Sequence, residues 1–315
     1  MTAAIRNFFL KQDFQDVITP PMVDNPGFEP HIHPFQIKSI YKNQTLPQFL
    51  HTSPEFHMKE LLSYGLEKIF NISYCFRDEP TSPIHRQQFL MCEWYRSNVA
   101  YEKIMTDIEQ LIPHCIEYFQ SKKLEISQSI TNQKVQRLTI SEIFQKEMGF
   151  DILDFLEKNQ IKDLMESKFP DIPLPEENCM SWDDYFFLLF LNKIEPQLKN
   201  YPLLILYEYP RHLSALSTIK KDDPRVCERF EFYISGIEVA NCYSELTDLE
   251  EQKHRYQNSK SLKKELYRYD LPTPNILFDA LERKIPVSSG IALGIERLLL
   301  GITGRKDIFY SSDRN

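Results

Sequence analysis

The sequence lacks several features that would each have placed it in a broad class of proteins. No apolar run approaches the roughly 18 to 20 residues that cross a bilayer, because the longest one, YFFLLFL, covers only residues 185–191. The six cysteines form no CxxC pair and no paired spacing, which argues against a disulfide framework and a zinc site. The formal net charge of −8 argues against a general affinity for nucleic acid. We therefore expect a cytoplasmic protein with reduced thiols and no membrane contact.

The sequence has no internal repeat and no low-complexity tract. We also expect no secretory signal, since Lys11, Asp13 and Asp16 fall where a signal peptide would stay apolar. The 315 residues, of which 42% are hydrophobic, suffice for a sizeable core. Hairpin patterns flanked by helical patterns, without regular βαβ alternation, predict an antiparallel sheet in an α+β fold. We expect one domain over residues 1–315 with a mostly helical insertion at about 122–200, where no residue suggests chemistry.

Local patterns predict the main elements. Ser53 is expected to cap a helix that begins at Pro54, and Thr139 and Ser181 are expected to cap helices in the insertion. A turn at Ser235-Gly236 should join two strands within residues 229–246. The other expected elements are helices at 54–64, 101–120 and 247–268, strands at 68–76, 87–96 and 202–210, and a strand that runs into a helix near residues 288–302.

The hairpin CFRDEPTSPIHRQQFLMCEWYR, residues 75–96, keeps charge where core is expected. Residues two apart in a strand share a face, so Phe89, Met91, Glu93 and Tyr95 lie together. The opposite face is also largely apolar, which predicts a central strand with Glu93 in a dry environment. A buried lone charge costs several kcal/mol. A salt bridge from Glu93 to Arg77 or Arg96 is the simplest structural explanation.

The second hairpin repeats this oddity. Glu231 and Glu238 come near one another across the turn, and Asn241, Tyr243 and Glu245 share a face of the returning strand. Such carboxylates require countercharge, which a divalent cation such as Mg²⁺ or a cationic substrate would supply. Together with Arg77 and Arg297, which suit anionic groups, they describe a pocket that fits ATP, Mg²⁺ and a basic amino acid.

Three ordered segments carry a resemblance to a known family. FRDE followed by HRQQFLMCEWY resembles motif 2 of the class II aminoacyl-tRNA synthetases of the lysyl type. GIALGIER resembles their motif 3, and FFLKQDFQDVITPP resembles motif 1 with Pro20 as its proline. The resemblance extends through HTSPEFHMKELL and RFEFYISGIEVANCYSELTDLEEQ, and so covers residues 5–303 apart from 122–200.

The segment similar to motif 1 begins within the first twenty residues, so we expect no OB-fold anticodon-binding domain and no anticodon recognition. A lysyl-type catalytic domain of this size resembles the elongation factor P lysyltransferase family. That resemblance implies a homodimer that activates (R)-β-lysine or lysine with ATP and transfers it to a lysine of elongation factor P. Ala292 stands where lysyl-tRNA synthetases usually have glycine, which would reshape the amino-acid pocket toward a β-amino acid.

The resemblance also implies roles for individual residues. Arg77 and Arg297 would be the catalytic residues, and Glu231 and Glu238 would carry Mg²⁺. The residues implied to bind ATP are Arg77, Glu79, His85, Phe89, Glu238, Val239, Gly294 and Arg297. Those implied to bind the amino acid are Ser53, Glu55, Glu93, Tyr95, Asn241, Tyr243, Glu245 and Ala292. No side chain need act as a nucleophile, because alignment and charge neutralisation suffice.

Three residues depart from the family pattern. Arg86 and Gln88 stand where Asn and Glu are common, beside the ATP contacts, and Cys242 replaces a glycine that we expect beside the pocket. Two other functions remain open: a paralogue that forms lysyl-adenylate for tRNA or a small molecule, and a non-catalytic module that senses an amino acid. The presence of Arg77, Glu238 and Arg297 argues against the non-catalytic module. The transfer to elongation factor P is the preferred function.

Overall fold

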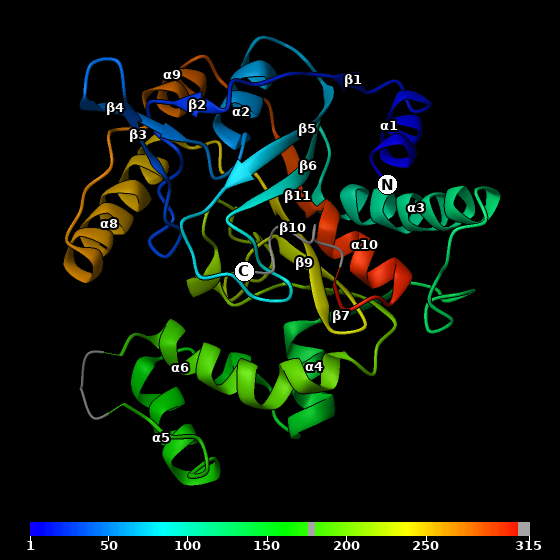
Figure 1. Ribbon diagram of the computed structural model, residues 1–315. Coiled ribbons are helices and arrows are strands. Elements are labelled where there is room, and N and C mark those ends of the chain that lie inside the picture. Colours follow the sequence, from blue (N-terminus) through cyan, green and yellow to red (C-terminus); the bar gives the residue numbers. More distant parts are fainter. Residues whose placement is uncertain (176–179, 308–315) are drawn as a thin grey trace. The chain divides into compact units, whose positions relative to one another are not determined.

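The computed structural model describes residues 1–175 and 180–307 (Figure 1). The chain divides into two compact units. The first combines Met1–Ile126 with Ser244–Asn315, and the second is Ser127–Tyr243. That the two units act together as one catalytic domain stays a prediction.

The first unit is built on a sheet whose middle strands are antiparallel. Its strand order is β1-β5-β6-β11, with β1 parallel to β5 at the edge. The strands are β1 (Gln15–Asp16), β5 (Lys68–Phe76), β6 (Gln88–Ser97) and β11 (Ser288–Gly294). β6 pairs with β5 on one side and β11 on the other, so the prediction of a central strand is confirmed.

One face of this sheet carries the aromatic core. The ring centroid of Phe9 lies 5.0 Å from that of Phe70 on β5 and 5.0 Å from that of Trp94 on β6. The guanidinium of Arg96 is paired with the buried carboxylate of Asp107 at 2.7 Å. Three helices lie on this side (Figure 1): α1 (Thr2–Leu10), α3 (Tyr101–Ser121) and α10 (Ile295–Thr303).

The opposite face carries Glu93 and Tyr95 and is covered by α2. This helix packs against α9, and α9 in turn packs against α8. A small second sheet, of order β2-β4-β3, lies beside them (Figure 1). The bounds are α2 (Glu55–Ser63), α8 (Leu249–Tyr267), α9 (Asn275–Glu282), β2 (Met22–Val23), β3 (Gln36–Ser39) and β4 (Gln44–Leu50).

The second unit contains four strands in the order β10-β9-β8-β7. β10, β9 and β8 are antiparallel neighbours, whereas β7 is parallel to β8 because helices connect the two. The strands are β7 (Gln136–Thr139), β8 (Leu203–Tyr207), β9 (Arg229–Ile234) and β10 (Ile237–Ser244). The helices are α4 (Ile140–Met148), α5 (Lys158–Lys168), α6 (Trp182–Leu189), α7 (Glu195–Leu198), the 3₁₀ turns η1 (Ile152–Asp154) and η3 (Arg211–Leu213), and the π-helical turn η2 (Phe190–Ile194).

Most predicted elements are confirmed within a few residues, including the helix caps at Thr139 and Ser181, both of which form capping boxes. The cap of α2 was wrong by one residue, since Pro54 is the N-cap. The Ser53 hydroxyl instead accepts a hydrogen bond from the Glu55 backbone N–H at 3.0 Å and donates its own hydrogen elsewhere.

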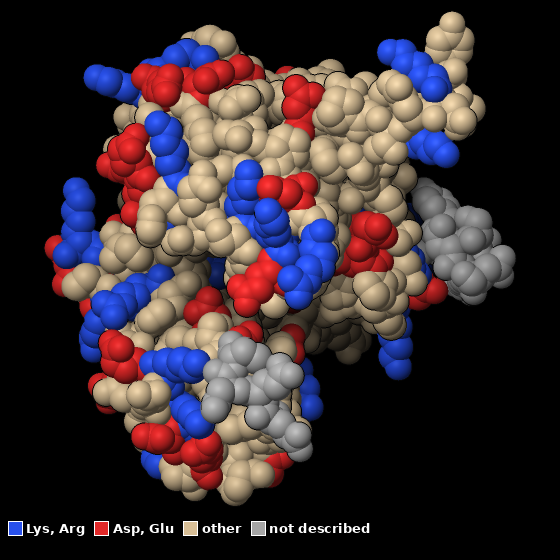
Figure 2. All heavy atoms as spheres, turned by 90° about the vertical axis from the view of Figure 1, so that its left-hand side faces the viewer, with Lys and Arg blue, Asp and Glu red and all other residues tan. Residues whose placement is uncertain are grey.

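The surface carries charges of both signs (Figure 2), and the described cysteines are buried. Lys and Arg side chains are interspersed with Asp and Glu on the face drawn in Figure 2. Among the described helices, none has the length and apolar character needed to cross a membrane. The five cysteines that the structure describes are buried thiols, and Cys179 lies outside the described residues.

Candidate functional site

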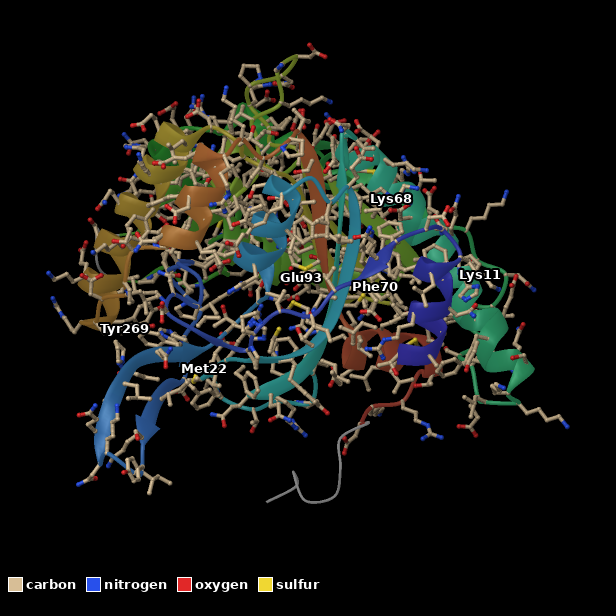
Figure 3. All side chains as sticks on the ribbon, turned by 90° about the horizontal axis from the view of Figure 1, so that it is seen from above. Lys11, Met22, Lys68, Phe70, Glu93 and Tyr269 are labelled. Atoms are coloured by element: carbon tan, nitrogen blue, oxygen red, sulfur yellow. The ribbon has the colours of Figure 1, made fainter. Side chains whose placement is uncertain are left out.

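Glu93 lies inside the first unit, beside α2, and is 1% exposed (Figure 3). The Ser53 hydroxyl donates a hydrogen bond to Glu93 Oε1 at 2.6 Å, and the Tyr95 hydroxyl donates to Oε2 at 3.1 Å. Neither partner is an arginine. The expected salt bridge to Arg77 or Arg96 was therefore wrong, because Arg96 lies on the other face of β6 and binds Asp107.

This environment changes the acidity of Glu93. Burial raises the pKa of Glu93 to about 8, and the nearby carboxylate of Glu55 adds to the rise. The hydrogen bonds from Ser53 and Tyr95 act in the opposite direction. The side chain can therefore change between a neutral acid and a carboxylate near neutral pH, according to whether a cation is bound beside it.

A buried lysine joins two further acids at this site. Lys59 on α2 is 1% exposed, and its Nζ lies 2.5 Å from Glu55 Oε1 and 2.6 Å from Glu245 Oε2. Burial alone would lower the pKa of Lys59, but Glu245 and Glu55 raise it above the ordinary value, so the group stays an ammonium. The pKa of Glu245 is raised by burial, and Lys59 opposes this rise.

The floor of the site is a strand with almost no side chain. Gly290 on β11 faces Tyr95 of β6, and Ala292 is opposite Glu93. A Cβ atom on Gly290 would lie 2.1 Å from Tyr95 Cε1 and 2.6 Å from Glu245 Oε1. Glycine is therefore required here because the tyrosine ring and the carboxylate occupy the space of a side chain.

The groups expected to bind ATP begin where β5 ends. The guanidinium of Arg77 lies 5.2 Å from the centre of the Phe89 ring. Its Nε is buried and has no hydrogen-bond partner among the described residues. The backbone N–H of Glu79 donates to the Arg77 carbonyl at 3.0 Å. The guanidinium thus lies over one face of Phe89 and has donor capacity left for an anionic group.

The loop between β5 and β6 meets the start of α10. Arg297 Nη2 lies 2.7 Å from His85 Nε2, and the Ser82 hydroxyl lies 2.9 Å from His85 Nδ1. Burial and the charge of Arg297 lower the pKa of His85. Glu296 accepts the backbone N–H of Leu90 at 2.9 Å and 3.0 Å, which fixes α10 to β6 next to this contact. Gly294, the N-cap of α10, is opposite Met91.

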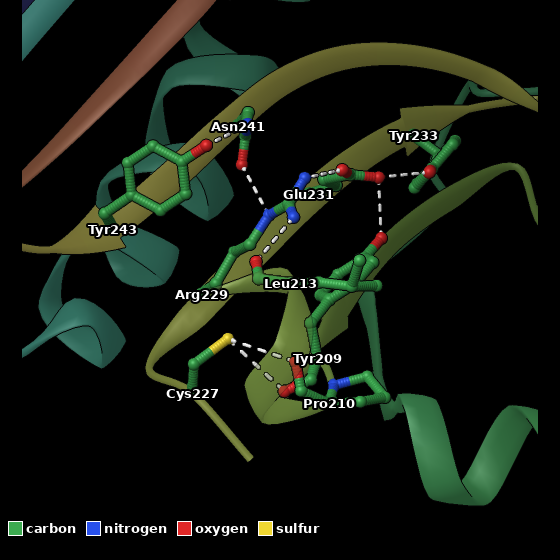
Figure 4. A network of polar contacts seen from close by, with 9 residues as sticks. All are labelled: Tyr209, Pro210, Leu213, Cys227, Arg229, Glu231, Tyr233, Asn241 and Tyr243. Atoms are coloured by element: carbon green, nitrogen blue, oxygen red, sulfur yellow. Dashed lines mark hydrogen bonds and ion pairs between the residues drawn. The ribbon is translucent and has the colours of Figure 1, made fainter. Parts of the chain in front are cut away.

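Three predicted residues of the second unit, Glu231, Asn241 and Tyr243, lie in a polar network on β9 and β10 (Figure 4). Arg229 Nη2 lies 2.5 Å from Glu231 Oε1, and the Tyr209 hydroxyl donates to Glu231 Oε2 at 2.6 Å. The Tyr233 hydroxyl also donates to Oε2. Glu238 is opposite Tyr233, so it is the diagonal neighbour of Glu231 on one face of the hairpin.

Asn241 and Tyr243 belong to the same network. Arg229 Nε donates to Asn241 Oδ1 at 3.2 Å, and Asn241 Nδ2 donates to the Tyr243 hydroxyl at 2.8 Å. Cys242 pairs with Phe230 and is fully buried. Strand alternation turns its side chain to the face opposite the side chains of Asn241 and Tyr243, and its thiol lies 3.9 Å from the Tyr243 carbonyl oxygen. The expected effect of Cys242 on the pocket stays a prediction. Val239 is also buried.

Two carboxylates of the second unit could take part in holding a metal. Glu231 and Glu238 offer the oxygen ligands that Mg²⁺ prefers. Both oxygens of Glu231 already accept hydrogen bonds, so a metal ion there would share the carboxylate with Arg229 or displace a donor. Residues 1–175 and 180–307 contain no group of three or more His, Cys, Asp or Glu that could hold a metal by protein ligands alone.

Comparison with known proteins places these residues in a family. The sequence matches the family model for tRNA synthetases class II (D, K and N) over residues 1–310. The chain belongs to the class II tRNA synthetases. The resemblance read from the three sequence motifs is thereby confirmed, as is the α+β fold of this class.

Similar proteins within this class II family share one name. An elongation factor P–(R)-beta-lysine ligase of Haemophilus influenzae is 31% identical over 303 residues, which are 95% of this chain and 87% of the relative. The protein of that name from Histophilus somni is 30% identical over 308 residues, 97% of this chain and 90% of the relative. The protein of that name from Erwinia tasmaniensis is 31% identical over 301 residues, which are 95% of this chain and 87% of the relative.

The first unit of this class II chain brings together Ser53, Glu55, Glu93, Tyr95 and Glu245 by direct contacts, with Ala292 opposite Glu93. It also brings His85 to Arg297, and Arg77 to Phe89. In the second unit, Arg229 joins Glu231 to Asn241, which in turn bonds Tyr243.

Sequence reasoning missed Lys59, Gly290, Arg229 and Glu296. Signals for each were present. Lys59 follows Glu55 by four residues, so the two share a helix face. Residues two apart in a strand share a face, so Gly290 shares one with Ala292 and Gly294. For the same reason Arg229 shares a face with Glu231. Glu296 directly precedes the arginine that we had selected.

Proposed function

We propose that the protein activates (R)-β-lysine or lysine with ATP and transfers the aminoacyl group to a lysine side chain of elongation factor P. The observation that carries the proposal is the buried cluster of Glu55, Glu93 and Glu245, which suits an amino acid with two ammonium groups. Its class II family and the printed names of its relatives support the same reaction.

In the proposed first step the substrate carboxylate attacks the α-phosphorus of ATP and pyrophosphate leaves. Arg77 would bind the α-phosphate while Phe89 stacks on the adenine, and Glu79 would bind the adenine. His85 and Arg297, which already touch, would bind the outer phosphates. These groups act by alignment and by neutralising charge that develops on the phosphate oxygens.

In the proposed second step the amino group of an elongation factor P lysine attacks the carbonyl carbon of the aminoacyl-adenylate. A new amide bond forms, AMP leaves, and the amine loses one proton. Mg²⁺ bound by Glu231 and Glu238 would neutralise phosphate charge. Ser53, Glu55 and Glu93 would orient the substrate through its α- or β-amino group, with Tyr95 and Glu245 at the distal ammonium.

Three further parts of the proposal are finer than the family itself. We expect a homodimer formed through the segment similar to motif 1, a cytoplasmic location, and ATP with Mg²⁺ as the nucleotide substrate and metal. Sedimentation of the purified chain would test the dimer directly.

The decisive measurement is pyrophosphate exchange into ATP in the presence of (R)-β-lysine, L-lysine or other amino acids. We expect exchange with a lysine isomer and far less with amino acids that carry one amino group. Incubation with elongation factor P should then add one aminoacyl group to one lysine, seen by mass spectrometry of the intact protein. Absence of exchange with both isomers would contradict adenylate formation, and exchange without modification would contradict the transfer step.

A further inference from the structure

Lys59 is the most deeply buried charge of the amino-acid site that the proposed reaction does not use. It is 1% exposed and contacts acids from two parts of the chain, Glu55 one helical turn before it and Glu245 just after β10. A buried ammonium is costly unless carboxylates surround it closely. A chain that needed only a filled core at this position could have used leucine or methionine.

The charges around Lys59 can be counted. Three carboxylates face the site, those of Glu55, Glu93 and Glu245, and Lys59 is the ammonium in direct contact with two of them. If all are ionised, three negative charges and one positive charge leave a net charge of −2. Glu29 lies near Glu55, and burial together with the charge of Glu55 raises the pKa of Glu29, which favours its neutral form. Tyr95 contributes a neutral hydroxyl.

A lysine isomer carries two ammonium groups, so its amino groups match this net charge. Without Lys59 the same carboxylates would present −3 and leave one acid without a cation. We propose that Lys59 is a positioning residue that neutralises one of the three carboxylates and thereby sets the amino-acid site to accept two ammonium groups. This inference rests on the proposed function, because it specifies how that site selects a diamino acid.

The carboxylates around Lys59 also keep hydrogen-bond acceptor capacity for the substrate. Lys59 contacts one oxygen of each carboxylate, Oε1 of Glu55 at 2.5 Å and Oε2 of Glu245 at 2.6 Å. An ionised carboxylate accepts up to about four hydrogen bonds. Glu55 and Glu245 can thus keep their contact with Lys59 while they accept hydrogen bonds from a second ammonium.

The test compares Lys59→Met, Lys59→Arg and the wild type by pyrophosphate exchange and by calorimetric binding of both lysine isomers, from about pH 6 to about pH 9. In Lys59→Met the acids lose their cation, which raises their pKa values, so the ionised site forms only at higher pH. We expect KM to rise about tenfold or more at neutral pH and its pH midpoint to move upward. Lys59→Arg should keep a midpoint near that of the wild type, and Lys103→Met, on the exposed side of α3, should change neither quantity.

A double variant separates charge from folding. Lys59→Met with Glu245→Gln removes one charge of each sign and restores a net charge of −2. We expect its pH midpoint to return toward the wild-type value although KM stays high. Equal midpoints in the wild type and Lys59→Met would overturn the role of Lys59. If Lys59→Met does not fold, the double variant decides. A pH midpoint in the double variant that is shifted upward as far as we expect for the loss of Lys59 alone would contradict the charge count. Failure of the wild type to exchange with either isomer would instead contradict the proposed function.

Discussion

Glu93 shows how a single residue can couple binding to protonation. Its carboxyl accepts hydrogen bonds from Ser53 and Tyr95, yet burial and Glu55 raise its pKa to about 8. In the protein without substrate the group is therefore mostly neutral at pH 7. An ammonium that binds beside it favours the carboxylate and lowers the pKa again.

We expect this change to release protons when a lysine isomer binds. Affinity should rise as the pH increases from about 6 to about 8 and level off above the pKa of the free group, because less work is then needed to ionise Glu93. Calorimetry in buffers with different ionisation enthalpies would measure the number of protons released.

Glu93→Gln provides the control for this prediction. The amide keeps the shape of the side chain but cannot titrate, so the pH dependence of binding over this range should flatten while affinity falls. An unchanged pH profile of lysine affinity in Glu93→Gln would assign the pH dependence of binding to another group.

The raised pKa of Glu93 also affects stability. The folded protein holds a proton that the unfolded chain loses, so this group contributes less to the free energy of unfolding as pH rises from about 4.5 to about 8.

At the scale of one element, β11 has small residues on one of its faces. Its residues 290, 292 and 294 share a face and are glycine, alanine and glycine. The tyrosine ring of β6 and the carboxylate of Glu245 fill the space above Gly290. The strand thus supplies backbone and almost no volume at the site.

Gly290→Ala should therefore damage the amino-acid site selectively. The new methyl group would push Tyr95 from its contact with Glu93, at a cost of about 1–3 kcal/mol in stability, and KM for lysine isomers should rise more than KM for ATP. Steady-state exchange kinetics with each substrate varied in turn would show the difference. Ser288→Ala is the matched control, since Ser288 is buried on the same strand and its hydroxyl has no hydrogen-bond partner among the described residues. Normal lysine KM in Gly290→Ala would refute the crowding.

Elements are also the scale at which the sequence was most informative. Alternation in residues 87–96 predicted the central strand and its two faces, since the period of two follows directly from strand geometry. Caps at Thr139 and Ser181 were readable because the bonds are local. The parallel pairing of β7 with β8 was not readable, because it depends on where the intervening helices return the chain.

For the molecule as a whole, the sequence identified many candidate groups but not their partners. Glu93 was predicted as a buried acid, yet its donors Ser53 and Tyr95 became known only from the fold. Glu245 was also predicted, but its partner Lys59, which is distant in the sequence and lies 2.6 Å away, was missed. Contacts of this kind depend on tertiary packing that no short sequence pattern encodes.

The stability of the first unit should depend on one buried ion pair. Arg96 holds Asp107 through bonds of 2.7 Å and 2.9 Å, and Asp107 also accepts from Trp94 at 3.2 Å, so β6 is fixed to α3. Asp107→Ala leaves the guanidinium without its carboxylate, and we expect a loss of about 3–5 kcal/mol. Chemical denaturation would measure it. Arg6→Ala, which removes a partly exposed pair with Asp16, should cost about 1 kcal/mol or less. Equal losses in the two variants would contradict this difference.

The pairing of β6 with β11 has a consequence for how the protein is made. Ala292 lies opposite Glu93, so the ribosome must add about two hundred residues between the two halves of that ladder. All residues of the second unit leave the ribosome during this interval, while the edge of β6 that will receive β11 is still unpaired. An exposed strand edge of this kind is a target for chaperones and for wrong partners. The nascent chain is thus most vulnerable just before β11 emerges.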